Sequence, residues 1–435
     1  MKILREPDAR LIKEYRNNYT AHSENLRPLS FLVRIKEDND TEIIYNVLTG
    51  GAVRLSAEEF ESEEKYLSDN LYLVPGDFDE YAFVDDLRVY YSLKNRAKSV
   101  INNYFIYPTT GCNARCFYCF EEGIAPRVMS DETALKTAEY ITENSKGKPV
   151  RIKWFGGEPS MCMPTIKLIS EKLQENGVSF TSKMNTNGYL TDEKMIKDLY
   201  ETCMLRIVQI PVDGVGKDYD TIKNYVDVPQ NLSPWDKIVT NIGLFLRAGI
   251  QVDIRLNIGN HNKEKIPGIL DELTGKFKDR KNFRIFPQVL NEGKYDFYSE
   301  EERAELFEIQ KKAYVSCLEA GITIAQNRYS LPAFSLHSCF ADDSAWVGIS
   351  PEGRIYKCPE NINNELYFSE LGSSARDEEK IDMFYEKNSW ESCKSCAFYP
   401  SCVNLKECIA RQRICEECHR DFRLWKTERI LRAIP

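Results

Sequence analysis

The chain has 435 residues, of which 42% are hydrophobic and 29% charged, and its formal net charge is −9. This length allows about two to four domains, and the composition is that of an ordinary globular protein. The negative charge disfavours a nucleic-acid partner, because such partners usually require a basic surface. We find neither the apolar core of a secretory signal at the start nor a run near the ~18 apolar residues of a membrane span. We therefore expect a cytoplasmic protein with no membrane partner.

Residues 1–98 predict a small α+β domain. Ser56 followed by Glu59 is the pattern of a capping box, which indicates that a helix begins there. Three β-rich runs precede two helical stretches, at 30–36, 42–48, 52–55, 57–69 and 81–98. This part of the sequence contains no catalytic constellation, so it predicts a binding or packing role.

Strand and helix patterns alternate strictly from about residue 103 onward. The strands are expected at 104–108, 150–155, 179–185, 205–212, 250–258 and 283–289. The helices are expected at 131–145, 163–176, 191–202, 235–248, 263–277 and 299–320. Six consecutive β/α units predict an α/β fold with a parallel sheet and right-handed crossovers. Because eight units are needed to close a barrel of this kind, we expect an open, partial (β/α)6 TIM-like barrel.

The chain contains 14 cysteines, and they are unevenly placed. Three lie close together in the loop after the first barrel strand, as Cys112, Cys116 and Cys119. Spaced cysteines in a reducing compartment more often bind metal or do chemistry than form disulfides. The irons of a [4Fe–4S] cluster normally take four cysteines, so three thiolates would leave one iron open to another ligand. A structural zinc site that borrows a fourth ligand is the competing interpretation.

Polar residues follow the carboxyl end of each of the next strands, where parallel β/α sheets carry their working residues. Two glycines admit a small ligand close to the backbone, and a glutamate can accept a hydrogen bond from an ammonium group. The residues in question are Gly156, Gly157, Glu158, Asn185, Asp213, Arg255 and Asn257. We expect them on one rim of the barrel.

The Cys112-x3-Cys116-x2-Cys119 loop, with Tyr118 before its third cysteine, and the Gly156-Gly157-Glu158 motif resemble the radical S-adenosylmethionine (SAM) superfamily. The resemblance covers most of residues 103–320. It implies that SAM binds the open iron and is cleaved by an electron from the cluster to give a 5′-deoxyadenosyl radical. Tyr118 would then face the adenine, and residues 156–158 the methionine end.

The resemblance extends to four further positions on the rim. Asn185, Asp213, Arg255 and Asn257 would contact the ribose or the carboxylate of SAM. Related enzymes often carry an arginine some ten residues after Asp213. Here that region holds Lys223 and no arginine, so Arg255 is a possible substitute for the carboxylate contact.

The last hundred residues are loop-rich and hold eight cysteines, whose spacing resembles a SPASM domain with two auxiliary [4Fe–4S] clusters. One auxiliary cluster would use Cys339, Cys358 and Cys408, and the other Cys393, Cys396, Cys402 and either Cys415 or Cys418. We favour Cys418. Cys415 could complete the first auxiliary cluster, or that cluster could keep an open iron. A zinc-ribbon-like module is the alternative.

The expected domains are a peptide-recognition-like (RRE-like, winged-helix-like) domain at 1–98, a radical SAM partial barrel at 99–330 and a SPASM-type domain at 331–435. Residues 43–60 carry a likeness to the leader-binding element of ribosomal-peptide maturases. Such an element can bind a leader peptide as an added strand. The alternative is a plain packing domain.

This set of resemblances implies a peptide maturase with three [4Fe–4S] clusters and SAM, similar to the thioether-forming sactipeptide and ranthipeptide synthases. Its partners would be a precursor peptide with a leader sequence and an electron donor such as ferredoxin or flavodoxin. It would abstract hydrogen from the peptide and form a thioether, with a carbon–carbon cross-link or an epimerisation as other outcomes. The alternative function is that of an anaerobic sulfatase-maturating enzyme, which forms formylglycine.

Overall fold

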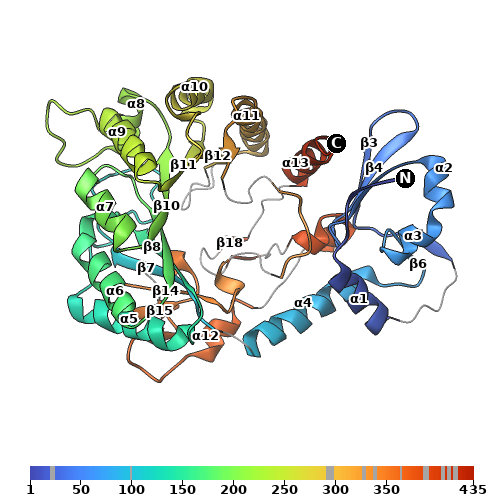
Figure 1. Ribbon diagram of the computed structural model, residues 1–435, viewed down its shortest axis with the longest axis horizontal. Helices are drawn as coiled ribbons and strands as arrows, with labels where there is room; N and C mark the ends of the chain where they lie inside the picture. The colour runs from blue at the N-terminus through green and yellow to red at the C-terminus, as the bar shows by residue number, and fades with distance from the viewer. Residues whose placement is uncertain are drawn as a thin grey trace. The chain divides into compact units, whose positions relative to one another are not determined.

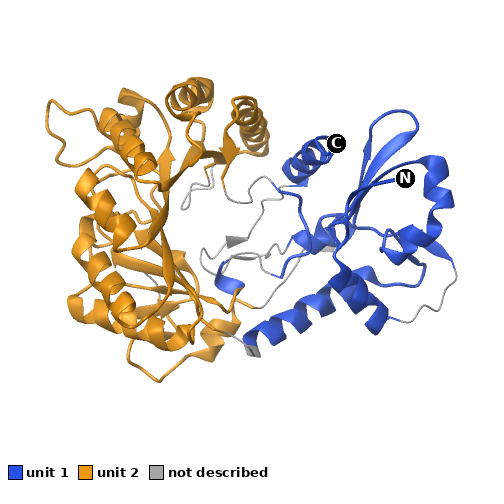
Figure 2. Ribbon diagram, viewed as in Figure 1, with its two compact units in different colours: residues 1–98, 329–342, 386–435 blue, residues 99–328, 343–385 orange. Residues whose placement is uncertain are grey.

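The computed structural model describes residues 1–435 except 20–24, 98–99, 291–297, 326–329, 337–339, 363–364, 386–390, 403–406, 409–412 and 415–419. Two compact units divide the chain (Figure 2). The first unit contains residues 1–98, 329–342 and 386–435, and the second contains residues 99–328 and 343–385. The last hundred residues of the chain are therefore divided between the two units. Within the described ranges, every helix is too short or too polar to cross a lipid bilayer.

The first unit is built on a four-stranded antiparallel sheet in the order β1-β5-β4-β3. Its strands are β1 (Lys2–Arg5), β3 (Leu32–Lys36), β4 (Thr41–Asn46) and β5 (Ala52–Ser56), and a separate ribbon pairs β2 (Leu26–Pro28) with β6 (Leu73–Pro75). Its first four helices are α1 (Ala9–Asn18), α2 (Ala57–Ser62), α3 (Glu64–Asp69) and α4 (Glu80–Ala97). The capping box of Ser56 and Glu59 is confirmed, because both of its hydrogen bonds form at the start of α2.

The core of the first unit includes residues from the end of the chain. Phe31 and Tyr45 of the N-terminal segment are fully buried, and Phe398, Tyr399 and Leu431 pack in the same hydrophobic cluster. The other elements of this unit are η3 (Phe340–Asp342), η5 (Glu391–Ser395), η6 (Tyr399–Ser401), β17 (Glu407–Cys408), β18 (Arg413–Ile414) and α13 (Arg420–Arg432). The N-terminal segment therefore packs its core against part of the cysteine-rich segment.

The second unit contains the six expected strands as parallel neighbours in chain order. They are β7 (Asn103–Thr109), β8 (Val150–Gly156), β9 (Phe180–Asn185), β10 (Leu205–Val212), β11 (Gln251–Ile258) and β12 (Phe283–Val289). Its helices are α5 (Asp131–Ser145), α6 (Met163–Glu175), α7 (Glu193–Glu201), α8 (Lys217–Lys223), α9 (Pro234–Arg247), α10 (Ile266–Phe277) and α11 (Glu300–Glu319). The expected partial barrel is confirmed, and α8 is an additional short helix (Figure 1).

The sheet continues beyond the six strands at both edges, to ten strands in total. The added strands are β13 (Thr323–Ile324) at one edge and β14 (Trp346–Ile349), β15 (Arg354–Tyr356) and β16 (Ser369–Glu370) at the other, followed by α12 (Glu378–Asp382). β14 runs parallel to β7, whereas β15 and β16 are antiparallel to their neighbours. Part of the expected SPASM-type segment thus extends the barrel sheet.

The two faces of the barrel strands have different compositions, because successive side chains point to opposite sides. Val208 and Ile210 are fully buried in the core that the strands share with the helices. Gln209 lies on the opposite, inner face, with Asn185 and Asp253 as its register partners on β9 and β11. This row of the inner face is therefore polar, whereas the helix-covered face is apolar.

Candidate functional site

The three-cysteine loop follows β7, as expected. The backbone N–H of Cys119 donates to the carbonyl of Cys116 at 3.1 Å, which closes a tight turn between the last two cysteines. The end of α8 and the residues that follow it form hydrogen bonds with the backbone of the loop. Arg115 N donates to Lys223 O at 2.9 Å, and Val226 N donates to Asn113 O at 2.8 Å. The connection from β10 to β11 therefore helps to fix the loop's path.

The two glycines at the end of β8, Gly156 and Gly157, contact the start of the cysteine loop. A Cβ on Gly156 would lie 2.3 Å from the carbonyl oxygen of Thr109, and a Cβ on Gly157 would lie 2.2 Å from that of Gly111. Gly156 also adopts a φ of +110°, which side chains rarely tolerate. Only glycine permits this close approach of two backbones.

Glu158 is fully buried beneath the rim and binds protein groups from two neighbouring loops. Its carboxylate accepts hydrogen bonds from Ser160 N at 3.0 Å and Ser160 Oγ at 2.6 Å, and from Thr186 Oγ1 and Asn187 N, both at 2.7 Å. Burial raises the pKa of this carboxyl, although these hydrogen bonds act in the opposite direction. Glu158 thus orients the turn after β9. Asn187 in turn donates to Asn113 of the cysteine loop at 2.7 Å.

A buried cation lies at the centre of the rim. Lys223 Nζ lies 2.5 Å from Asp213 Oδ2 and donates to Tyr118 Oη at 2.6 Å. Tyr118 Oη donates to Asp213 Oδ2 at 2.7 Å, and Asn257 Nδ2 donates to Asp213 Oδ1 at 2.5 Å. The side chains of Lys223 and Asp213 are 1% and 0% exposed. Asn262 completes the network by donating to the Asp213 carbonyl at 2.8 Å.

This network explains the protonation behaviour of its members. Burial alone would lower the pKa of Lys223, but the carboxylate of Asp213 and the hydroxyl of Tyr118 raise it well above its usual value. Burial and then Asp213 raise the pKa of Tyr118. Lys223 is therefore a permanent cation, and Tyr118 a permanent hydrogen-bond donor.

The loop thiols are buried enough to be protonated without metal. Burial raises the pKa of Cys112 to about 12 and also raises that of Cys116 and Cys119. Thiols must lose their protons to bind iron. In the part of the chain that the structure describes, no three Cys, His, Asp or Glu side chains converge as a ready-made set of metal ligands.

Several buried polar atoms around the loop have no hydrogen-bond partner among the described residues. They are both carboxyl oxygens of Glu121, Nδ2 of Asn113, and Oδ1 of Asn185 and Asn257. Buried polar atoms are normally satisfied, so such a group at one rim is typical of a site that receives a polar ligand. The donors and acceptors present, together with three nearby thiols, fit a [4Fe–4S] cluster with SAM.

The structure brings most of the predicted rim residues to one place. Asp213, Asn257 and Tyr118 share the buried network, whereas Arg255 lies two residues before Asn257 on the same face of β11. Sequence reasoning missed the positions of Lys223 and Glu121. The spacing of ten residues from Asp213 was the available signal for Lys223, because related enzymes often place their arginine there.

Three cysteines outside both cysteine-rich segments, Cys162, Cys203 and Cys317, are buried. Of the cysteines assigned to auxiliary clusters, Cys339, Cys415 and Cys418 lie outside the described residues, and only the backbone of Cys408 is described. Cys358 lies in the second unit.

Cys393, Cys396 and Cys402 lie in consecutive tight turns of the first unit. Cys396 N donates to Cys393 O at 3.0 Å. The buried guanidinium of Arg88 on α4 donates to Tyr399 O at 2.6 Å and to Cys402 O at 3.4 Å. The N-terminal segment therefore anchors the backbone that carries these cysteines.

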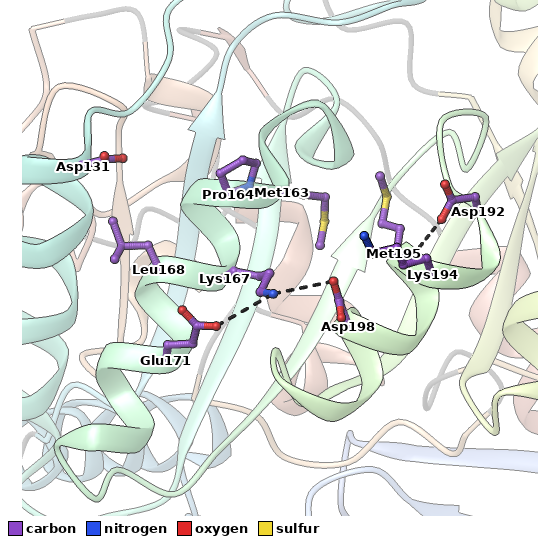
Figure 3. A pocket seen from close by; sticks show the side chains of 10 residues that line it. All are labelled: Asp131, Met163, Pro164, Lys167, Leu168, Glu171, Asp192, Lys194, Met195 and Asp198. Atoms are coloured by element: carbon purple, nitrogen blue, oxygen red, sulfur yellow. Dashed lines mark hydrogen bonds and ion pairs between the residues drawn. The ribbon is translucent and has the colours of Figure 1, made fainter.

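A pocket of about 630 Å³ lies away from the site, on the helical side of the second unit (Figure 3). Lys167 of α6 lies 3.9 Å from Glu171 and 3.7 Å from Asp198 of α7 along its wall. No predicted site residue lines this pocket.

A parallel partial barrel whose first strand leads into a three-cysteine loop, with a Gly-Gly-Glu turn against it, defines a radical SAM domain. Residues 106–273 match the sequence profile of the Radical SAM superfamily. The chain therefore carries a radical SAM domain, and the protein is an enzyme. SAM and a [4Fe–4S] cluster are the cofactors of this domain.

Curated relatives are named as cyclases. GTP 3′,8-cyclase of Clostridium perfringens strain SM101 is 25% identical over 268 residues, 58% of this chain and 78% of that protein. A probable GTP 3′,8-cyclase of Archaeoglobus fulgidus is 29% identical over 206 residues, 46% of this chain and 62% of that protein.

Two solved structures share the fold at low sequence identity. Native anSMEcpe with bound AdoMet is 15% identical and superimposes with a TM-score of 0.60, covering 76% of this chain and 100% of that chain. Streptococcus suis SuiB bound to S-adenosylmethionine is also 15% identical. It superimposes with a TM-score of 0.51 and covers 89% of this chain and 96% of that chain.

We predict that Lys223→Met lowers the free energy of unfolding by about 3–5 kcal/mol, because it leaves the buried Asp213 carboxylate without its cation. Urea unfolding followed by tryptophan fluorescence measures the loss. The double variant Lys223→Met with Asp213→Asn should recover part of it. Lys217→Met, at an exposed position of the same helix, is the control. Equal stability of Lys223→Met and Lys217→Met would contradict the assignment.

We also predict that Gly157→Ala weakens SAM binding to the reconstituted protein by about tenfold or more, since a methyl group would push Gly111 and the cysteine loop away. Equilibrium dialysis with labelled SAM measures the affinity. Gly275→Ala on α10 is the matched control, because its Cβ would meet no atom within 4 Å. Unchanged SAM affinity in Gly157→Ala would show that the close backbone approach is not required.

Proposed function

We propose that the protein is a radical SAM maturase of a ribosomally made peptide, which it cross-links through a thioether. The observation that carries this proposal is the union, in one chain, of the radical SAM rim with an N-terminal sheet unit that holds a cysteine-rich segment. Two structures of similar fold support a peptide substrate. SuiB is described as bound to the precursor peptide SuiA, and anSMEcpe as bound to a Kp18Cys peptide.

We assign the following roles to residues of this chain. Cys112, Cys116 and Cys119 would hold the cluster, and residues 156–158 would receive the methionine end of SAM. Arg255 would be the candidate for the carboxylate contact, because Lys223 is buried and paired with Asp213. When bound, the cofactors supply a 5′-deoxyadenosyl radical that takes a hydrogen atom from the peptide. The polar inner face would then orient the peptide. A ferredoxin or flavodoxin would provide the electron.

Two auxiliary [4Fe–4S] clusters belong to this proposal, with the cysteine assignments given above. Arg88 contributes to one of them through the Cys402 carbonyl, which it holds from α4. The expected domain boundaries at 98 and 330 describe functional parts. They differ from the compact units, which divide the auxiliary segment between them.

The N-terminal sheet is the proposed leader-binding element. Strand addition needs a free edge, and the two edge strands of this sheet are β1 and β3. A leader peptide would therefore pair with the outer side of β1 or with β3. The second edge is flanked by α13, whose Arg432 donates to the carbonyl of Lys36 at 2.7 Å.

Formylglycine formation is the second candidate. The structure of anSMEcpe with a Kp18Cys peptide, which superimposes with a TM-score of 0.60, supports a peptide substrate for this candidate as well. Both candidates act on a peptide or protein. Both reactions would be two-electron oxidations, in which the 5′-deoxyadenosyl radical would accept one hydrogen atom, an auxiliary cluster would accept the second electron and a proton would go to solvent. They differ in product, because one forms a carbon–sulfur bond and the other an aldehyde.

The proposed chemistry predicts that reconstituted protein with dithionite and SAM releases 5′-deoxyadenosine, and that Cys112→Ala abolishes this release because the cluster loses a ligand. Liquid chromatography with mass detection measures the product. Cys317→Ala, a buried cysteine of α11 outside the rim, should retain activity. Release of 5′-deoxyadenosine by Cys112→Ala at the wild-type rate would end the radical assignment.

The auxiliary clusters give an independent prediction. Three clusters require roughly twelve irons per chain, and Arg88→Met should lose roughly four of them, because the turn that carries Cys402 is released. Iron and protein assays on anaerobically reconstituted samples measure this loss. Arg10→Met, at an exposed position of α1, is the control. Roughly four irons in the wild type would contradict the auxiliary-cluster proposal.

A further inference from the structure

The inner face of the barrel sheet is aromatic at its first two strands. Side chains of β7 alternate between two sides, and Tyr104 and Ile106 belong to the core beneath the helices. Phe105 and Tyr107 point the opposite way and pack in a separate cluster. Phe155 of β8 joins them, with its ring centroid 5.9 Å from that of Phe105 and 5.5 Å from that of Tyr107.

Two further rings extend this cluster. The ring centroid of Trp346 on β14 lies 5.0 Å from that of Phe105, and Phe120 of the cysteine loop stacks on Phe155 at 6.1 Å. Phe120 is 38% exposed, and Phe155 and Trp346 are half-buried, so part of this surface is accessible. We name Phe105, Tyr107, Phe120, Phe155 and Trp346 the aromatic wall.

Glu121 lies beside the aromatic wall with an unused hydrogen-bonding group. Its side chain is 7% exposed, and neither carboxyl oxygen has a hydrogen-bond partner among the described residues. Ile124 N donates to the backbone carbonyl of Glu121 at 3.1 Å, and Ile124 packs in the cluster of the wall. Burial raises the pKa of Tyr107, and the nearby carboxylate of Glu121 raises it further. Because a buried acceptor without a donor is costly, Glu121 indicates a ligand that donates hydrogen bonds.

The proposed cofactors give this carboxyl group no partner of its own. A cluster held by three thiolates carries net negative charge once it is reduced, so it repels a carboxylate. The methionine end of SAM is assigned to residues 156–158, in the turn after β8. The donor that Glu121 requires is therefore expected from the substrate.

The surroundings of Glu121 favour an uncharged donor. An anionic ligand would be repelled by the carboxylate. A cationic ligand would meet Lys153, whose Nζ lies 5.0 Å from two ring centroids of the aromatic wall. It would also meet Arg127, which attracts the Glu121 carboxylate and whose Nε lies 2.9 Å from Glu352. A peptide backbone offers what remains, an uncharged N–H next to an apolar side chain.

We propose that Glu121 accepts a hydrogen bond from a backbone N–H of the peptide substrate, whose neighbouring apolar side chain packs on the aromatic wall. This inference rests on the proposed function and names the substrate class, a peptide with an aliphatic or aromatic residue beside the modified position. Phe120 and Glu121 directly follow Cys119 in the sequence. The contact would therefore hold the peptide beside the three-cysteine loop.

Two synthetic peptides test the inference without turnover. Each carries an N-terminal fluorescein, a central cysteine flanked by leucines and an amidated C-terminus. In the second peptide both leucines are N-methylated, which removes their N–H donors and keeps their side chains. Fluorescence anisotropy on the anaerobic holoenzyme with SAM measures both affinities. We expect the unmethylated peptide to bind about tenfold more tightly, because it satisfies a buried acceptor.

Glu121→Leu should abolish this preference by weakening only the unmethylated peptide. Glu122→Leu, at the exposed neighbouring position, is the matched control and should retain the preference. Phe155→Leu should weaken both peptides to the same extent, because it alters the wall and leaves the acceptor in place. Equal affinities for the two peptides in the wild type, or no binding of either, would overturn the inference without requiring any variant to fold. A preference that survives Glu121→Leu would also overturn it.

Guanosine is the third probe, because a guanine base also presents uncharged N–H donors beside a flat ring and the curated relatives are named GTP 3′,8-cyclases. Binding of guanosine that depends on Glu121, with equal affinities for the two peptides, would assign the site to a base and overturn the inference. Peptide preference without release of 5′-deoxyadenosine would refute the proposed function alone. Release of 5′-deoxyadenosine without the preference would refute the binding inference alone.

Discussion

The buried ion pair between Lys223 and Asp213 is the interaction on which the candidate site depends. It joins the end of β10 to α8, and Tyr118 extends it into the cysteine loop. An ion pair that is nearly unexposed must have its remaining hydrogen-bonding capacity satisfied, or its desolvation cost exceeds its attraction. Here Tyr118 and Asn257 supply those hydrogen bonds. The loop after β7, the end of β10 and the end of β11 are therefore connected through this one ion pair.

A second constraint acts on the same loop from the other side. The backbones of Gly157 and Gly111 approach so closely that a single methyl group would separate them. Glu158 then connects this turn to the one after β9 through Asn187. The loop is thus held by steric contact on one side and by an ion pair on the other, which leaves its thiols between two rigid supports. Catalytic geometry benefits from such pre-organised support.

Much of the barrel could be predicted from its sequence, because long periodic segments identify helices and strands reliably. The helix expected at 131–145 is α5 without any change of boundary, and Ser56 correctly marks the start of α2. The short strands β1 and β13 to β16 were not predicted. Each has two to four residues, which is too few for a periodic pattern, and each forms only because a neighbouring strand offers an edge.

Part of the candidate site was also predicted from the sequence, but from the spacing of motifs and not from the periodicity of helices and strands. Motif spacing identified the cysteines, residues 156–158, Asp213 and Asn257, since their positions after strands follow from the topology. Lys223 was recognised only as a departure from the expected arginine. Its role as the buried partner of Asp213 depends on the tertiary structure. The local sequence does not show which side chain of a short helix is buried. Glu121 was missed because an acidic residue after a cysteine loop resembles an ordinary exposed turn.

The central claim is that the three-cysteine loop holds a cluster with an open iron to which SAM binds. The most direct test is the electron paramagnetic resonance spectrum of dithionite-reduced, reconstituted protein, recorded with and without SAM. We predict that the signal of the reduced cluster changes shape when SAM is added, because SAM would become a ligand of the open iron. A spectrum that SAM leaves unchanged, in protein with a full complement of iron, would contradict the account.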